Sequence, residues 1–276
     1  MKSIAVLLCV MFLVIGLPSA SAQKRAETDQ TREAFFNSRK NTPAKPIRKV
    51  TTSQRKQPLA KAAHAVTVEP VGLGYTLLKQ GTDGTPVRVS AGQVFHDGER
   101  LRLMIEPKVS GYLYIFSVEN NGAPELIFPN PRLQNGENQV AAHVLYEVPS
   151  SNEPRSENRW FAVQGAAATE HLYLIISRTP LEDVPTGKAL VTYCGGKADC
   201  AWQPEAAAWG SLVAQTDAAV TTSQEAALGR RLAMVERYSL ERHIGLPPSA
   251  PAPAVIKMNQ SVQDKMLITV MNLIHK

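Results

Sequence analysis

The sequence predicts a mainly β protein: an Ig-like β-sandwich with a C-terminal helical segment and a closing strand. Three observations lead to this fold class. Short stretches of alternating apolar and polar residues between residues 71 and 193 are separated by Gly, Pro, Asn and Asp clusters, which is typical of sandwiches. An Ala-rich stretch follows residue 200, and a last alternating stretch occupies residues 265–274.

The central strands carry the clearest pattern. In residues 99–106, Leu101, Leu103 and Ile105 alternate with polar residues. We therefore expect these three side chains on the core face and the charged side chains on the opposite, polar face. Residues 111–118 are apolar on both faces, which predicts a strand in the middle of a sheet with cover on each side.

Shorter strands complete the predicted sandwich domain of residues 68–200. Residues 73–79 and 86–90 flank the turn cluster 81–84 and predict a hairpin. Further short strands are expected at 125–128, 159–163, 171–177 and 190–193. The polar stretch 132–157 is interpreted as a long loop with one short element.

The C-terminal residues 201–276 are predicted to pack on the sandwich as a helical extension plus a strand. Residues 204–215 are rich in Ala and favour a helix. A second helix is expected to begin near Ser223, a good N-cap, and to stop at Gly245, because apolar residues between them recur at helical spacing. Residues 265–274 predict the closing strand.

The first 22 residues have the layout of a secretory signal peptide. Lys2 precedes an apolar run over residues 4–17, and small residues follow at 20–22. The run is shorter than the roughly 20 residues of a membrane span. We expect cleavage between Ala22 and Gln23, with a retained N-terminal anchor as the alternative. The mature chain is then extracytoplasmic, periplasmic or secreted, without a transmembrane segment.

Residues 23–67 are predicted to be a disordered basic linker. Residues 23–66 hold 11 Lys and Arg against 3 Asp and Glu, whereas residues 67–276 hold 18 against 21. Such a polar segment buries too little apolar surface to fold alone, although a short helix over 28–39 is an open alternative. We expect the linker to act either as a spacer or as a segment that binds an anionic envelope polymer or lipid by electrostatic attraction. Nucleic acid is not an expected partner of an exported protein.

Cys194 and Cys200 are the only cysteines after the signal segment. In an oxidising compartment an isolated pair across a short Gly-containing loop predicts a disulfide. Free thiols and a zinc site are the alternatives, and the second is disfavoured because no further ligand pair has zinc-site spacing.

Catalytic and cofactor motifs are absent from the sequence. The six histidines are scattered and match no metal-binding spacing, and no nucleophile elbow, phosphate loop or dinucleotide fingerprint occurs. We therefore predict no catalytic, cofactor-binding or metal-binding residues.

Three ordered motifs resemble the bacterial domain-of-unknown-function family 4384, over roughly residues 71–180. They are the Phe-x-x-Gly-Glu-Arg string at 95–100, Gly-Tyr-Leu-Tyr at 111–114, and Phe-Pro-Asn at 128–130. The resemblance implies a β-rich module of exported bacterial proteins and transfers no active site. The motif residues are expected to be structural, with glycines in turns, aromatic residues in the core and Arg100 beside Glu99 or Glu106. The set comprises Phe95, Gly98, Glu99, Arg100, Gly111, Tyr112, Tyr114, Phe128, Pro129 and Asn130.

The expected function is that of an exported, non-catalytic binding or assembly module of the bacterial cell envelope, which recognises a protein or an envelope polymer. The sheet edge or the loop 130–157 is the expected contact surface. Two other classes stay open: an envelope hydrolase whose site is assembled from distant residues, and a sensor domain for a small ligand. A pocket with convergent ionisable groups is the observation that separates these classes.

Overall fold

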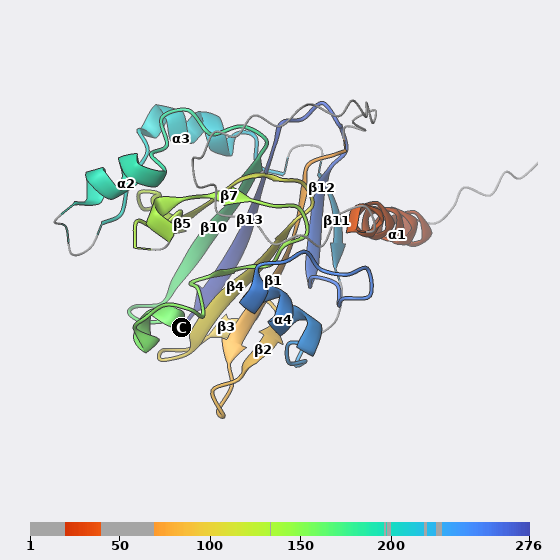
Figure 1. The fold of residues 1–276 in the computed structure, drawn as a ribbon, viewed down its shortest axis with the longest axis horizontal. Coiled ribbons are helices and arrows are strands. Elements are labelled where there is room, and N and C mark those ends of the chain that lie inside the picture. Colours follow the sequence, from red (N-terminus) through yellow and green to blue (C-terminus); the bar gives the residue numbers. More distant parts are fainter. Residues whose placement is uncertain are drawn as a thin grey trace, which may run out of the picture.

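The protein is a sandwich of two β-sheets, seen here in a computed structural model (Figure 1). The structure describes residues 20–39, 69–132, 134–195, 197, 200–217, 220–224 and 228–276. The mainly β fold predicted from the sequence is confirmed. The predicted signal segment before residue 20 and most of the predicted linker, residues 40–68, lie outside the described residues.

The first sheet combines strands of the predicted domain with two strands from beyond residue 200. Its main path runs in the order β11 (Val220–Gln224), β12 (Val255–Asn259), β1 (Gly72–Gln80), β4 (Arg100–Pro107) and β8 (Tyr146–Val148). Two short strands join this path, β2 (Pro86–Val89) on β1 and β9 (Phe161–Ala162) on β4. All of these pairs are antiparallel, and the β1–β2 pair is the predicted hairpin.

The second sheet is built on long central strands. Its main path runs in the order β3 (Val94–Phe95), β13 (Met266–His275), β10 (Ala168–Ser177), β5 (Gly111–Glu119) and β6 (Glu125–Phe128), with β7 (Gln139–Val140) also on β5. Only the short β3–β13 pair is parallel among the described strands. The closing strand predicted at 265–274 is therefore a central member of this sheet.

Helices cover the outer faces of the two sheets. They are α1 (Ala20–Arg39), α2 (Gly187–Cys194), α3 (Ala206–Val213) and α4 (Met234–Arg242), with short 3₁₀ turns at Gln134–Gly136 and Ser156–Arg159. On the second sheet, Trp209 of α3 packs on Phe116 and Tyr173, with ring centroids 5.2 and 4.9 Å away. This cover explains why β5 is apolar on both faces, as predicted.

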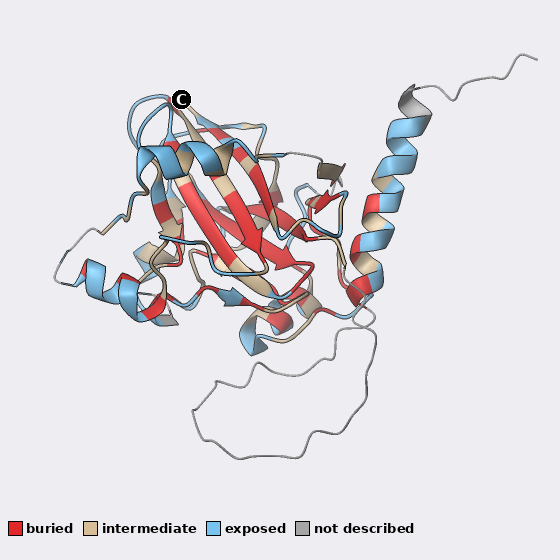
Figure 2. Cartoon of the chain, turned by 90° about the horizontal axis from the view of Figure 1, so that it is seen from above, coloured by how far each residue is buried: buried red, intermediate tan, exposed pale blue. Residues whose placement is uncertain are grey.

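The core lies between the sheets, and residues 99–106 contribute to it as expected. Leu101, Leu103 and Ile105 are buried in the main apolar cluster. The opposite face carries the charged side chains Arg102 and Glu106, as expected, and both of them are buried as well. Chain segments from elsewhere cover that face, since Glu106 is bonded to Arg39 and Arg102 to the Arg159 carbonyl. Figure 2 shows that buried residues, in red, run along the strands of the sheets. Its charges are therefore paired inside the protein.

Arg102 shows how one such charge is accommodated. Its guanidinium lies 4.0 Å from the Trp160 ring centroid and donates hydrogen bonds of 2.9 and 2.7 Å to the Arg159 carbonyl. Burial lowers the pKa of Arg102, and the Glu147 carboxylate 3.4 Å away opposes that shift. The N–H groups of this guanidinium therefore have protein partners and do not need bulk water.

Two local predictions differ from the structure. Residues 190–193 belong to helix α2 rather than to a strand, and Ser223 lies in strand β11 rather than at a helix start. The helix predicted from Ser223 is α4, which begins at Met234. In the case of Ser223, pairing with Ile256 of β12 overrides the local helix preference.

The ends of the chain also differ from the predicted organisation. Residues 20–39 form helix α1 where a disordered linker is predicted from residue 23. Its last turns pack on β11 and β12, and Phe35 is buried there. Strands β12 and β13 are interior members of the sheets, so the sandwich extends beyond the predicted boundary at residue 200. Among the described residues, no helix is long and apolar enough to cross a membrane.

Candidate functional site

A cavity opens between the two sheets at the end where β5 and β13 finish and β10 begins. Its volume is about 490 Å³. The lining residues come from both sheets and from the turns beside them: Phe95, Leu101, Ser117, Glu119, Gly122, Ala123, Glu125, Ile127, Phe161, Ala162, Val163, Gln164, Ala168, Glu170, Leu172, Leu273 and His275. The first sheet supplies residues of β4 and β9, and the second supplies the rest of the strand positions.

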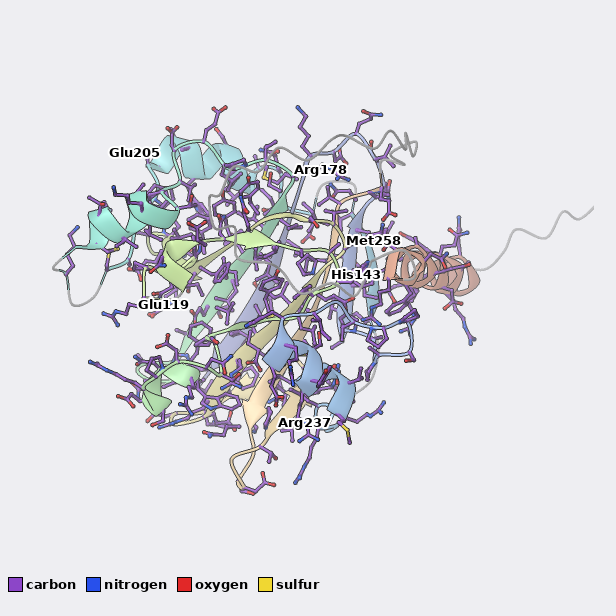
Figure 3. All side chains as sticks on the ribbon, viewed as in Figure 1. Glu119, His143, Arg178, Glu205, Arg237 and Met258 are labelled. Carbon is purple, nitrogen blue, oxygen red and sulfur yellow. A yellow bond between two sulfur atoms is a disulfide. The ribbon has the colours of Figure 1, made fainter. Side chains whose placement is uncertain are left out.

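The cavity has an apolar interior and an acidic rim. Phe95, Leu101 and Leu172 belong to the main apolar cluster of the sandwich. Glu119 and Glu125 are exposed at the opening, and Figure 3 shows Glu119 at the edge of the molecule. An apolar group therefore fits inside while a positive charge pairs at the rim.

Two further polar groups line the cavity, Glu170 at the rim opposite Glu119 and His275 in the wall. The Ser117 hydroxyl donates a 2.5 Å hydrogen bond to the Glu170 carboxylate, which fixes one acceptor in place. The Nε2 atom of His275 is buried and has no hydrogen-bond partner within the described part of the chain. These groups add one oriented carboxylate and one unused ring nitrogen to the lining.

Among the described residues, the cavity has neither a serine nucleophile paired with a histidine base nor a metal-binding cluster. Ser117 is bonded to a carboxylate and to no histidine, so the described residues around it lack a base that is itself oriented by a third group. No group of three or more His, Cys, Asp or Glu within the described ranges is placed to hold a metal ion. The geometry suits binding of a cation with an apolar part.

A second constellation lies at the docked end of α1. The Ser38 hydroxyl is 2.7 Å from Nε2 of His143, and Nδ1 of His143 is 2.8 Å from Oε1 of Glu106. These separations are those of a Ser-His-carboxylate triad. Arg39 donates to the same carboxylate, from Nε at 2.6 Å and from Nη2 at 2.5 Å.

This constellation is closed to substrate. Glu106 is 1% exposed and His143 is 0% exposed. The Phe35 ring packs edge-on against His143 with centroids 5.4 Å apart. The small void beside Glu106 has no room for a water molecule. We therefore interpret the four polar residues as a docking site that holds α1 on the sandwich.

Sequence reasoning missed this network, because its members lie far apart in the chain. Ser38 and Arg39 belong to the predicted linker, Glu106 to the polar face of a predicted strand, and His143 to the long loop. The only local signal is the pair Phe35-Phe36 in an otherwise polar segment. That pair favours the alternative helix over 28–39.

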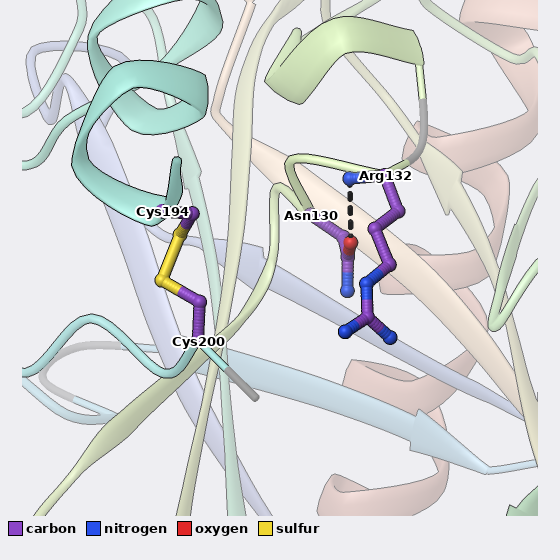
Figure 4. The surroundings of a disulfide bond; sticks show 4 residues. All are labelled: Asn130, Arg132, Cys194 and Cys200. Carbon is purple, nitrogen blue, oxygen red and sulfur yellow. Dashed lines mark hydrogen bonds between the residues drawn. A yellow bond between two sulfur atoms is a disulfide. The ribbon is translucent and has the colours of Figure 1, made fainter. Parts of the chain in front are cut away.

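The predicted disulfide is present. Cys194, the last residue of α2, is bonded to Cys200, with the two Cα atoms 5.4 Å apart (Figure 4). Beside it, the Asn130 side-chain oxygen accepts the backbone N–H of Arg132 at 2.9 Å. This bond shapes the turn that follows β6 and lies close to the disulfide in Figure 4. The bridge ties α2 to the following segment on the outer face of the second sheet.

The two motif glycines occupy positions where other residues fit poorly. Gly98 has a φ of +83°, a backbone conformation that L-residues rarely adopt. At Gly111, a Cβ atom would lie 2.2 Å from the carbonyl oxygen of Ser177 on the paired strand. The glycines therefore serve a turn and a close strand contact.

The other motif residues also have structural surroundings. Phe95, Phe128, Pro129 and Tyr114 are buried, and the Tyr114 hydroxyl accepts the Leu181 N–H at 2.9 Å. Tyr112 and Asn130 are half-buried, and Arg100 is exposed. Phe95 alone of this set also lines the cavity.

Glu99 pairs with Lys79 rather than with Arg100. The Lys79 ammonium donates to its carboxylate at 2.7 Å, and the His96 N–H donates at 3.1 Å. Partial burial raises the pKa of Glu99, but these two hydrogen bonds and the nearby positive charge outweigh it and leave the pKa below its usual value. Glu106, the other expected neighbour of Arg100, pairs with Arg39 instead.

The predicted cleavage position falls within a helix. Ala22 and Gln23 are the third and fourth residues of α1. The structure does not test cleavage, which stays a prediction from the sequence. The helix segment from Gln23 onward includes every α1 residue that contacts Glu106 or His143.

Comparison with known proteins identified one family. Residues 94–180 match the model of the family described as Domain of unknown function (DUF4384). The matched segment runs from β3 into the residues after β10 and so contributes strands to both sheets. Neither the curated proteins nor the solved structures gave a significant match.

Proposed function

Since residues 94–180 belong to the DUF4384 family, whose activity is not assigned, we propose the function from the cavity. The protein acts as an exported, non-catalytic binding module of the bacterial cell envelope. It takes a segment of a partner protein that carries a positive charge next to an apolar side chain. The cavity at the open end of the sandwich is the observation that supports this proposal.

The size and chemistry of the cavity support this ligand class. A volume of about 490 Å³ lies within the range of roughly 300–1,000 Å³ that is usual for ligand sites. Glu119, Glu125 and Glu170 give the opening three carboxylates. A Lys or Arg side chain pairs with such a rim, and a neighbouring apolar side chain enters the apolar interior.

The envelope location rests on the sequence and on one covalent feature. The N-terminal segment has the layout of a signal peptide, and the Cys194–Cys200 disulfide is typical of oxidising compartments. The resemblance of the three sequence motifs to a family of exported bacterial proteins favours the same location. Localisation by cell fractionation of a tagged full chain tests this part of the proposal, which fails if the protein stays in the cytoplasm.

The hydrolase class receives less support than binding. Glu119 and Glu125 lie at an exposed rim, where water screens their charge and weakens electrostatic stabilisation of a reacting group. The one geometry that resembles a triad, at Ser38, is closed. A free small amine is the remaining alternative, because it has the same charge as the Lys side chain of a peptide.

The test is a titration of the full chain with fluorescent peptides. One peptide has Lys residues beside Leu, a second replaces Lys with Glu, and a third replaces Leu with Ser. We expect the first to bind best, since it supplies both the charge and the apolar group. A simple amine such as butylamine, used as competitor, separates a small-ligand site from a peptide site.

Matched variants locate the binding. Glu119→Gln with Glu170→Gln removes two rim charges and is expected to weaken binding at least tenfold, while Glu157→Gln with Glu182→Gln removes two exposed charges elsewhere. Ala162→Trp fills the opening from an exposed strand position, with Ala207→Trp on α3 as its control. Equal binding by the rim variants and their controls refutes the cavity as the site.

A further inference from the structure

Helix α4 presents a basic and apolar face to solvent on the outside of the first sheet (Figure 1). Met234 and Tyr238 lie one turn apart on this face and are 77% and 51% exposed. Arg237 and Arg242 lie beside them and are also exposed. We propose that this face of α4 docks the protein on an anionic lipid surface.

The face is held rigidly by the body of the protein. On the inner side of α4, Glu236 is buried and its carboxylate pairs with the buried guanidinium of Arg88. Arg88 also donates to the Ala252 carbonyl at 3.1 Å and to the Thr76 hydroxyl at 3.3 Å. These contacts fix the rotation of the helix, so its outward side chains point away from the sandwich.

Positive charge dominates the outward side. Arg237 and Arg242 have no carboxylate within ion-pair distance among the described residues, and Figure 3 shows Arg237 at the margin of the molecule. Arg231 is paired with Asp83 at 2.7 Å, and both are exposed. Glu241 is the one carboxylate on the outward side of α4 itself.

The apolar side chains favour a lipid surface over a soluble polyanion. Exposed Met234 and Tyr238 gain little from a hydrated polymer. At a bilayer they enter the headgroup region, while the arginines reach lipid phosphates. The folded part of the chain from residue 67 has more acidic than basic residues, so the attraction is local to this face.

The surface is separate from the proposed ligand cavity. No residue of α4 lines that cavity. The contacts that hold α4 on the protein involve the first sheet and the segment after the helix. A lipid-bound molecule therefore keeps the cavity open to a partner. If the peptide titration shows no binding, the lipid-docking proposal still stands. If the vesicle experiment shows no binding, the proposal of a peptide-binding cavity still stands.

The test is co-sedimentation of the full chain with vesicles of about one part phosphatidylglycerol to three parts phosphatidylcholine. Each arginine near such a surface contributes roughly fivefold to binding, so Arg237→Gln with Arg242→Gln is expected to weaken partitioning roughly 30-fold. Lys188→Gln with Lys197→Gln, two exposed cations elsewhere, serves as the matched control. Pure phosphatidylcholine vesicles are expected to bind little.

A second variant separates lipid docking from general attraction to anions. Met234→Ser keeps the charge, and we expect it to weaken vesicle binding severalfold even at high salt, where charge attraction is screened. The basic residues 23–66 are unchanged in all variants. If the arginine pair and its control bind alike, α4 is not the docking surface. If Met234→Ser binds as the parent does and soluble polyglutamate displaces the protein from vesicles, the partner is a polymer and the proposal fails.

Discussion

Replacing Arg39 with Met is the sharpest test of the α1 docking site. The guanidinium is buried, donates to both oxygens of Glu106, and reaches the Ala250 carbonyl at 2.9 Å. Removing one partner of a buried ion pair costs about 3–5 kcal/mol, because the other charge stays desolvated. Through Arg39 the docked end of α1 is bonded to Glu106 and to the Ala250 carbonyl, so we expect this end of α1 to leave the sandwich and Glu106 to become hydrated.

Hydrogen exchange of the α1 amides measures this change directly. A loss of about 3 kcal/mol corresponds to roughly 100-fold faster exchange in the last turns of α1. The strands β5, β10 and β13 belong to the other sheet and are expected to keep their protection. Lys24→Met, at the exposed end of the same helix, is the control and is expected to change nothing.

A double-mutant cycle completes the argument. Glu106→Gln alone leaves the buried Arg39 without its carboxylate, whereas the double variant removes both charges and is expected to recover part of the loss. Unchanged protection in Arg39→Met, or simple additivity in the cycle, would refute the view that this ion pair holds α1. Burial of Phe35 would then account for the docking by itself.

Two further outcomes follow from buried contacts. Burial, with a smaller contribution from the negative charge of Asp217, raises the pKa of Tyr75 to about 12. This pKa in the folded state exceeds the unfolded value of 10.0. The neutral Tyr75 side chain therefore contributes its whole share of the unfolding free energy below pH 10, and this share is lost as the pH rises through 12. In urea titrations, the parent protein is expected to lose about 1 kcal/mol more unfolding free energy between roughly pH 9 and pH 11 than Tyr75→Phe does. An equal loss in both proteins would contradict this prediction. Gly111→Ala places a Cβ 2.2 Å from the Ser177 carbonyl oxygen and is expected to destabilise the protein by about 1–3 kcal/mol or more. Gly210→Ala, in α3 with open space around it, is its control and is expected to stabilise the helix slightly; equal thermal shifts for both would show that the strand contact is not tight.

Much of the central sandwich was predictable because its signal is local. Alternation with a period of two specifies a strand and its core face, so Leu101, Leu103 and Ile105 could be assigned from the sequence. The turn cluster at 81–84 likewise predicts the β1–β2 hairpin. With only two cysteines after the signal segment, the disulfide needed no knowledge of the fold.

The cavity could not be predicted in the same way. Its acidic rim combines Glu119, Glu125 and Glu170 from three different strands. Register between β5 and β10 places Glu119 directly opposite Glu170, and a sequence pattern does not contain that register. The open end of the sandwich is a property of two sheets together, so no single motif encodes it.

By itself, the sequence determined the β class, the faces of the central strands, the cysteine pairing and the family motifs. Only the tertiary structure decided that Glu106 is buried, that α1 returns to cover it, and that β12 and β13 are interior strands. Periodicity reports which residues share a face of one strand. Whether that face meets water or another part of the chain depends on contacts between residues far apart in sequence, such as Arg39 with Glu106.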